Sequence, residues 1–218
     1  MGQMSGVIVP VTLFQQNCAI LFDVDSKLGV VVDPGGDVPD ILAAISKAGV
    51  TVTAIWLTHG HLDHAGGAMS LKAALAEAGT AIEIIGPHKD DAILLANIEN
   101  SAERFGAAGT MFNCTPDRYL EEGEQLSFDG HVFDVLHCPG HAPGHVVYVN
   151  KAAAFAHVGD VLFNDSIGRT DLPQGNHAQL IASIKNKLLP LGDEVSFICG
   201  HGPGSTIGNE RRSNPYLR

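Results

Sequence analysis

A cluster of four potential metal ligands follows directly on a segment that is predicted to be a buried β-strand and precedes a predicted helix. The run reads Thr58-His59-Gly60-His61-Leu62-Asp63-His64. Residues two apart on an extended segment point to the same side, so His59 and His61 can reach one metal ion. Asp63 and His64 lie where the chain turns into the helix and suit a second ion. The alternative, a solvated polar turn, would leave several imidazoles at a strand end without partners, which is costly.

Further candidate ligands stand at the ends of later predicted strands. His141, Asp160 and His201 each lie next to a glycine, which allows the backbone to approach a crowded centre. A carboxylate has two oxygens and can bridge two ions, whereas a histidine binds one. The set therefore gives each of two ions three or four protein ligands. Spacing alone does not choose between His141 and His145.

Apolar runs alternate with amphipathic stretches along the whole chain, and no linker divides it, which favours a single domain over residues 1–218. Strands are expected at 6–12, 18–24, 28–32, 52–57, 81–85, 125–128, 132–137, 146–149, 153–158 and 195–199. Helices are expected at 39–48, 65–78, 89–101 and 177–188. Two similar β-rich halves with helices outside predict two sheets packed face to face, with helices on both outer surfaces.

Charge and hydropathy limit the partners and the location of the protein. The net charge is −11 with 13 Lys and Arg among 218 residues, which argues against binding to nucleic acid or to anionic lipid. The chain lacks a basic start and an apolar run of the roughly 18 residues that cross a bilayer. The four cysteines are scattered without a C-x-x-C pair, as is typical of buried thiols in a reducing compartment. We expect a cytoplasmic protein, and the sequence leaves its oligomeric state open.

At the residues described above, the sequence resembles the metallo-β-lactamase superfamily, whose T-H-x-H-x-D-H signature is complete at residues 58–64. Within it, the sequence is similar to hydroxyacylglutathione hydrolases, the glyoxalase II family, and especially to their short single-domain type. The segments that carry this resemblance are Asn17-Cys18, 32–36, 139–145, 159–163, 166–173 and 200–211. The resemblance implies an α/β fold, a four-layer αββα sandwich, and a metal-dependent hydrolase that cleaves S-lactoylglutathione to lactate and glutathione.

The resemblance also implies roles for individual residues. His59, His61 and His141 would hold a first metal ion, Asp63, His64 and His201 a second, and Asp160 would bridge them. Asp33 resembles a carboxylate that orients a ligand histidine. The cofactor would be two divalent ions, with zinc the first choice and iron or manganese also compatible.

Two such ions would lower the pKa of a bridging water and so supply hydroxide near neutral pH as the nucleophile for the thioester carbonyl. Asp63 would bind the second ion and orient the hydroxide. A thiolate leaves readily because the pKa of a thiol is near 8.5, so no strong general acid is required.

The chain differs from the longer glyoxalase II enzymes, which have a C-terminal helical domain, and carries Arg169 and Asp171 where they have a Lys and a Tyr. Arg169 is a candidate for substrate binding, although an ion pair with Asp171 is the preferred interpretation. If the tail folds back along the cleft, Arg211 or Arg212 could bind a substrate carboxylate; otherwise they are solvent-facing tail charges.

The chief alternative is a mononuclear iron persulfide dioxygenase, which shares the fold and a similar Gly-Arg-Thr-Asp loop. Such an enzyme would use a His/His/Asp set and would have little need of His64 or His201 as ligands. β-Lactam hydrolysis and a non-catalytic scaffold are weaker alternatives. Of the other histidines, His88, His131 and His177 are expected at the surface.

Overall fold

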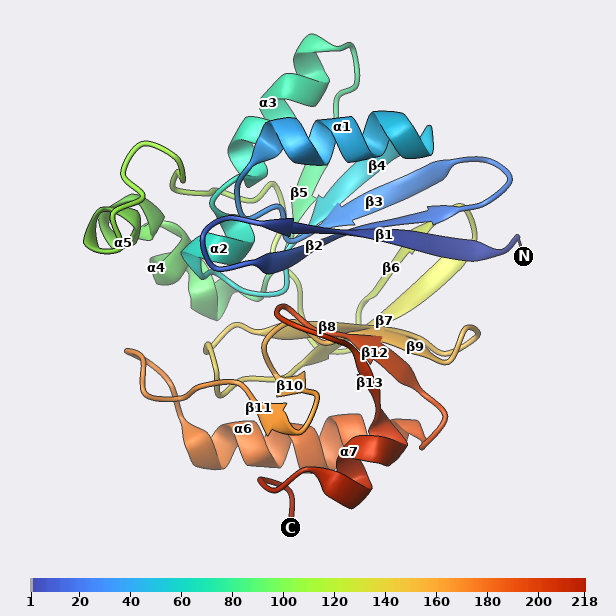
Figure 1. The fold of residues 1–218 in the computed structure, drawn as a ribbon, viewed down its shortest axis with the longest axis vertical. Coiled ribbons are helices and arrows are strands. Elements are labelled where there is room, and N and C mark those ends of the chain that lie inside the picture. Colours follow the sequence, from blue (N-terminus) through green and yellow to red (C-terminus); the bar gives the residue numbers. More distant parts are fainter. Residues whose placement is uncertain (1) are drawn as a thin grey trace.

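The computed structural model describes residues 2–218, and its two large β-sheets pack face to face (Figure 1). The N-terminal sheet has the strand order β1(Met4–Val11)-β2(Gln16–Asp23)-β3(Leu28–Val32)-β4(Thr51–Trp56)-β5(Glu83–Ile85). The C-terminal sheet has the order β13(Ser205–Thr206)-β12(Ser196–Ile198)-β9(Phe155–His157)-β8(Val146–Asn150)-β7(His131–His137)-β6(Gln125–Phe128). A small ladder pairs β10(Leu162–Phe163) with β11(Ser166–Ile167).

Helices cover the outer faces of both sheets. The α-helices are α1(Val38–Ala48), α2(Leu62–Ala65), α3(Ala68–Glu77), α4(Ala92–Leu95), α5(Ile98–Arg104), α6(His177–Ser183) and α7(Ile207–Ser213). Figure 1 shows α1 and α3 on the N-terminal sheet and α6 and α7 on the opposite side of the molecule, against the C-terminal sheet. The expected αββα sandwich is therefore confirmed.

The strand sequences alternate between two cores, as expected for sheets that are covered on both faces. In β2, Ala19 and Leu21 point into the core between the sheets, whereas Ile20 joins the core beneath α1 and α3. In β8, Tyr148 points between the sheets and Val147 toward α6. Burial on both faces explains why these segments read as continuous apolar runs.

The core between the sheets also positions the end of β4, where the histidine-rich run begins. The ring of Trp56 lies 5.3 Å from the rings of both Phe133 and Tyr148, measured between centroids. The buried Tyr148 hydroxyl donates a hydrogen bond of 2.6 Å to the carbonyl oxygen of Leu57. The C-terminal sheet thus holds Leu57, the residue between β4 and the histidine-rich run.

Several helices differ from their expected lengths. The helix expected at 65–78 is broken at Gly66-Gly67, where the Gly67 amide donates to the Pro34 carbonyl and a β-carbon on Gly67 would lie 2.6 Å from that oxygen. The helix expected at 89–101 consists of a 3₁₀ turn, α4 and α5. The helix expected at 177–188 changes to a π-helix at Ile184–Leu188, and a further 3₁₀ turn follows at Leu189–Leu191. Close backbone contacts of this kind have no periodic signal in the sequence.

Two expectations about surface and redox properties can be compared with the structure. Across residues 2–218, none of the helices has the length and apolar character needed to cross a bilayer. The cysteines Cys18, Cys114, Cys138 and Cys199 are buried and form no disulfide. Burial raises the pKa of all four thiols. They therefore stay protonated at neutral pH and serve as core residues rather than as nucleophiles.

Tyr148→Phe tests the hydrogen bond between the sheets. The substitution leaves the buried carbonyl of Leu57 without its partner, so we expect the free energy of unfolding to fall by about 1–2 kcal/mol. For a chain of this size the melting temperature of metal-free protein should drop by roughly 2–4 °C per kcal/mol. Tyr119→Phe is the matched control, because the half-buried Tyr119 hydroxyl makes no hydrogen bond within residues 2–218. Equal losses in both variants would contradict this role of Tyr148.

Candidate metal centre

The predicted ligands meet between the two sheets, at the ends of strands from both. His59 and His61 follow β4, and Asp63 and His64 lie in α2. The others come from the C-terminal half: His141 from the loop between β7 and β8, Asp160 after β9, and His201 after β12. Neither sheet alone supplies the whole set.

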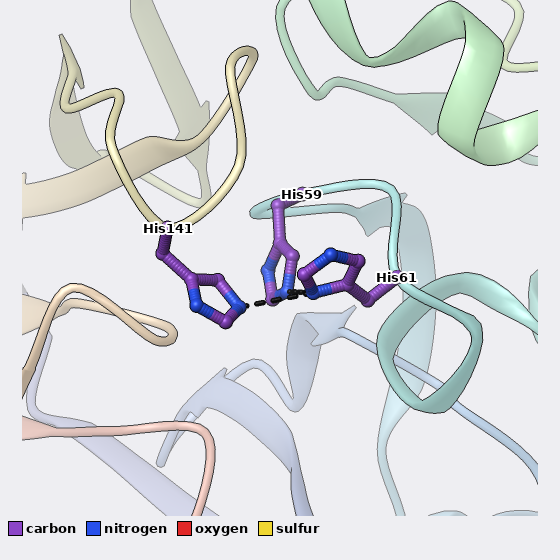
Figure 2. A group of neighbouring side chains, drawn as sticks. All are labelled: His59, His61 and His141. Atoms are coloured by element: carbon purple, nitrogen blue, oxygen red, sulfur yellow. Dashed lines mark hydrogen bonds between the residues drawn. The ribbon is translucent and has the colours of Figure 1, made fainter. Parts of the chain in front are cut away.

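His59, His61 and His141 form the first group, and their rings point toward one another (Figure 2). His61 Nδ1 lies 3.0 Å from His59 Nε2 and 2.9 Å from His141 Nε2. A ring nitrogen carries one lone pair or one hydrogen in the ring plane, so His61 Nδ1 cannot pair with both neighbours at once. A cation shared by three lone pairs satisfies all three nitrogens, and the donor set suits a divalent transition metal.

Asp63, His64 and His201 form the second group. Asp63 Oδ2 lies 3.2 Å from His201 Nε2 and 3.9 Å from His64 Nε2. His64 is fully buried, whereas Asp63 and His201 remain partly exposed. This group therefore borders solvent on one side.

Asp160 lies between the two groups. Its Oδ2 is 3.5 Å from His141 Nε2 of the first group and 3.5 Å from His201 Nε2 of the second, while Oδ1 is 3.3 Å from His64 Nε2. Asp160 Oδ1 and His64 Nε2 are buried and make no hydrogen bond within the described residues 2–218. Two buried polar atoms aimed into one space without partners fit a site for a cation.

Hydrogen bonds behind the first group set which ring nitrogen is free. His141 Nδ1 donates to the carbonyl of Arg169 at 2.8 Å, which leaves Nε2 as a lone pair. His59 Nδ1 lies 3.0 Å from Thr58 Oγ1, whose own hydrogen goes to Asp33 Oδ2 at 2.6 Å, so His59 Nε2 is free as well. Both free nitrogens face the centre.

The second group is oriented in the same way. His64 Nδ1 donates to Asp33 Oδ2 at 2.9 Å, and His201 Nδ1 donates to the carbonyl of Phe14 at 3.2 Å. Asp33 thus contacts His64, one of the predicted ligands. Backbone and carboxylate acceptors behind imidazoles are characteristic of metal-binding histidines.

Burial favours the neutral, metal-binding form of the imidazoles in the first group, and carboxylates give the second group a negative potential. Burial lowers the pKa of His59 and His141, and it lowers the pKa of His61 to about 3, so these imidazoles are neutral. Burial opposes the charged form of Asp160, but the neighbouring His64 outweighs it and holds the Asp160 pKa below its usual value. Burial likewise opposes charge on His64, yet Asp160 and Asp63 raise its pKa. The same negative potential attracts a metal cation.

Asp91 connects the two loops that carry the first group, and sequence reasoning did not identify it. Its buried carboxylate accepts hydrogen bonds from the Gly60 amide at 2.7 Å and from the Gly144 amide at 2.5 Å. Burial raises the pKa of Asp91 to about 6. An aspartate at the start of a predicted helix is common for electrostatic reasons, so nothing in the sequence distinguished this one.

His145 also supports the site without joining the ligand groups. Its ring stacks on that of His59, with centroids 4.6 Å apart, and its Nε2 accepts a hydrogen bond of 3.0 Å from the Asp160 amide. The structure therefore separates the two histidines that spacing left equivalent. His141 lies in the first group, and His145 lies behind it.

A cleft of about 690 Å³ opens onto both groups. Arg104 and Phe105 line one wall, and Arg169 lines the other. Arg169 forms a two-point ion pair with Asp171, at 2.8 and 2.7 Å, as the preferred interpretation of this loop expected.

Arg211 and Arg212 do not reach this cleft. They lie on α7, where Arg211 Nε donates to Asp193 Oδ1 at 2.8 Å and Arg212 donates to Asn209 Oδ1 at 2.8 Å. The tail forms a helix on the outer face of the C-terminal sheet and does not fold back along the cleft (Figure 1). The placement thus contradicts the expected role of these arginines in substrate binding.

Two histidines expected at the surface are buried. His131 Nε2 lies 2.9 Å from Asp23 Oδ2, which links the two sheets, and the His88 ring stacks on that of His137 at 4.3 Å. The expectation was wrong because both partners come from distant parts of the chain. His177 is exposed, as expected.

Asp91→Ala tests whether Asp91 positions the first group. The variant leaves two buried amides unpaired and frees both loops, so we expect metal affinity to fall at least about 10-fold, as for other residues that support metal ligands. A chelator competition titration measures this. Asp91→Asn keeps one acceptor oxygen, so its metal affinity should lie between those of Asp91→Ala and wild type. Asp90→Ala, at the exposed neighbouring residue, is the control. Unchanged affinity in Asp91→Ala would contradict the role.

Comparison with known proteins identifies the family. Residues 11–201 match the Metallo-beta-lactamase superfamily. The chain is 44% identical over 211 residues to "Hydroxyacylglutathione hydrolase GloC" of Haemophilus influenzae, covering 96% of each protein. Among solved structures, it resembles BLEG-1 B3 metallo-beta-lactamase with a TM-score of 0.87 at 35% identity, covering 99% of both chains. It also resembles TTHA1623 in a di-iron-bound form, with a TM-score of 0.85 at 36% identity, covering 97% of this chain and all of the other (100%).

The match to the family covers the run at residues 58–64 and all seven predicted ligands, from His59 to His201. The chain belongs to the metallo-β-lactamase superfamily and is a metal-dependent hydrolase of the hydroxyacylglutathione hydrolase-like type.

Proposed function

We propose that this protein is a dinuclear thioester hydrolase that cleaves S-lactoylglutathione to lactate and glutathione. The observation that carries the proposal is the complete second group around Asp160: Asp63, His64 and His201 have converging ligand atoms. A mononuclear dioxygenase, which would use a His/His/Asp set, would have little need of His64 or His201 as ligands. The 44% identity to hydroxyacylglutathione hydrolase GloC supports the choice of substrate.

The proposed ligand sets follow the two groups. His59, His61 and His141 hold the first divalent ion, Asp63, His64 and His201 hold the second, and Asp160 bridges them. Zinc is our first choice for a site of imidazoles and carboxylates, and the di-iron form of a relative supports iron as an alternative. Such ions supply Lewis acidity and lower the pKa of bound water, which provides a nucleophile at neutral pH.

The side chains that line the cleft suit a substrate whose leaving group needs no proton. Every carboxylate and imidazole that lines the cleft in the described chain belongs to the proposed ligand sets, namely His61, Asp63, His141, Asp160 and His201. None of them is left to protonate a leaving group. A thiolate departs without a proton, whereas an amine requires one, so a thioester suits this cleft better than an amide.

The remaining residues act by orientation. Asp33 and Thr58 hold the rings of His64 and His59 in the orientation that directs their free nitrogens to the centre. Asp63 lies at the border of the cleft, where it would bind the second ion and also orient the attacking water. The cytoplasmic location and the absence of nucleic-acid or membrane partners stay predictions.

Metal analysis of purified protein tests the dinuclear assignment. We expect about two ions per chain, because seven ligands exceed what one ion can use. Asp160→Ala should lose both ions, since it removes a ligand of each, whereas His201→Ala should keep the first. His177→Ala, at an exposed histidine, is the control. One tightly bound ion in fully loaded wild-type protein would contradict the proposal.

Activity assays test the reaction. We expect hydrolysis of S-D-lactoylglutathione without consumption of oxygen, and loss of activity after chelation that returns on addition of metal. An oxygen electrode with glutathione persulfide examines the dioxygenase alternative, and a β-lactam substrate examines the activity named for one structural relative. Oxygen uptake, or faster cleavage of the β-lactam than of the thioester, would overturn the assignment.

A further inference from the structure

Arg104 ends α5 and lines the cleft that opens onto the proposed metal ligands. Asn97, Ser101 and Arg104 are spaced four and three residues apart, so they lie on one face of a helix, and all three line the cleft. Figure 1 shows α4 and α5 side by side on the flank of the molecule. This helix face therefore forms one wall of the substrate cleft.

The charge of Arg104 is uncompensated. Among residues 2–218, no carboxylate forms an ion pair with it and no side-chain hydrogen bond holds it, and its side chain is exposed. Arg169, the other cation of the cleft, is neutralised by its two-point contact with Asp171. In a protein with a net charge of −11, Arg104 is thus the cleft's available partner for an anion.

The surroundings of Arg104 suit an organic ligand rather than a bare ion. Phe105 and Ile93, which line the same wall, are 53% and 68% exposed, which is unusual for such large apolar side chains. The Phe105 ring packs edge-on against Phe14, with centroids 5.5 Å apart, and the Phe14 carbonyl accepts the hydrogen bond from His201. The wall is therefore joined directly to the second ligand group.

We propose that Arg104 binds a carboxylate of the thiol portion of the substrate, so that the enzyme selects thioesters of carboxylate-bearing thiols. The inference rests on the proposed thioester hydrolysis. A guanidinium matches a carboxylate with two parallel hydrogen bonds, and the cleft volume of about 690 Å³ is in the range of sites for small molecules. Arg104 thereby takes the role that the sequence suggested for Arg211 and Arg212.

A purely structural role makes a different prediction. Arg104 lies in the last turn of α5, where a cation interacts favourably with the helix dipole. In that case a neutral substitution lowers the stability of the protein and leaves ligand recognition unchanged. The two roles can be separated because one depends on the charge of the ligand and the other does not.

The experiment compares two substrates with the same scissile bond. S-D-lactoylglutathione carries carboxylates, whereas the D-lactoyl thioester of N-acetylcysteamine carries none. In Arg104→Gln, assayed at low salt with full metal, we expect KM for the first substrate to rise about 10-fold, with kcat within twofold, and KM for the second to stay the same. The KM of Arg104→Lys for S-D-lactoylglutathione should lie between those of wild type and Arg104→Gln, because a lysine keeps the charge but cannot form two parallel hydrogen bonds. Arg212→Gln, on the outer helix, is the matched control.

A binding measurement separates this inference from the proposed function. Calorimetry with S-methylglutathione, a thioether that cannot be hydrolysed, should show a Kd about 10-fold higher for Arg104→Gln than for wild type, and thermal unfolding should show that the variant is folded. Unchanged KM and Kd for the glutathione compounds would overturn the role of Arg104, as would an equal rise in KM for both thioesters. If wild type cleaves neither thioester, the proposed function fails, and the Kd comparison still decides whether Arg104 binds the carboxylate.

Discussion

The buried carboxylate of Asp33 accepts three hydrogen bonds, from the Thr58 amide at 2.7 Å, the Thr58 hydroxyl at 2.6 Å and His64 Nδ1 at 2.9 Å. Asp33 itself has a φ of 53°, an uncommon conformation for a residue with a side chain, and its amide donates to the Trp56 carbonyl. These contacts hold together the ends of β3 and β4 and the start of α2. Through Thr58 and His64, one carboxylate orients a histidine of each ligand group.

The site also depends on the packing of the two sheets. Asp160 and His201 come from the C-terminal half, and the Asn17 side chain donates to the carbonyls of Cys199 and Gly202, which holds the His201 loop against β2. The backbone is so close here that a β-carbon on Gly200 would lie 2.0 Å from Asp160 Oδ1. Because the proposed ligands come from both halves of the sandwich, metal bound to the folded protein should stabilise the association of the sheets.

Electrostatics divide the cleft into two regions. Around the ligands, carboxylates create the negative potential that cations require. Along α5, Arg104, which has no carboxylate partner within residues 2–218, offers the opposite charge beside exposed apolar side chains. The substrate that we propose, with a thioester at one end and a carboxylate at the other, would contact both regions. The arginines of α7 are instead bound to Asp193 and Asn209 on the outer layer.

Much of the fold and the run of candidate ligands at residues 58–64 could be predicted from the sequence, because both have short-range signals. Short apolar segments between turn residues predicted β3 and β6 at their observed bounds, and the run at residues 58–64 placed four candidate ligand side chains within six residues. The tertiary structure alone decided which other residues support that run. Asp91 contacts amides 31 and 53 residues away, and His131 pairs with a carboxylate 108 residues away. Such contacts depend on how loops and sheets pack, and so does the choice of Arg104 rather than Arg211 as the cleft's cation. Local periodicity carries no information about them, since residues so far apart become neighbours only when the sandwich closes.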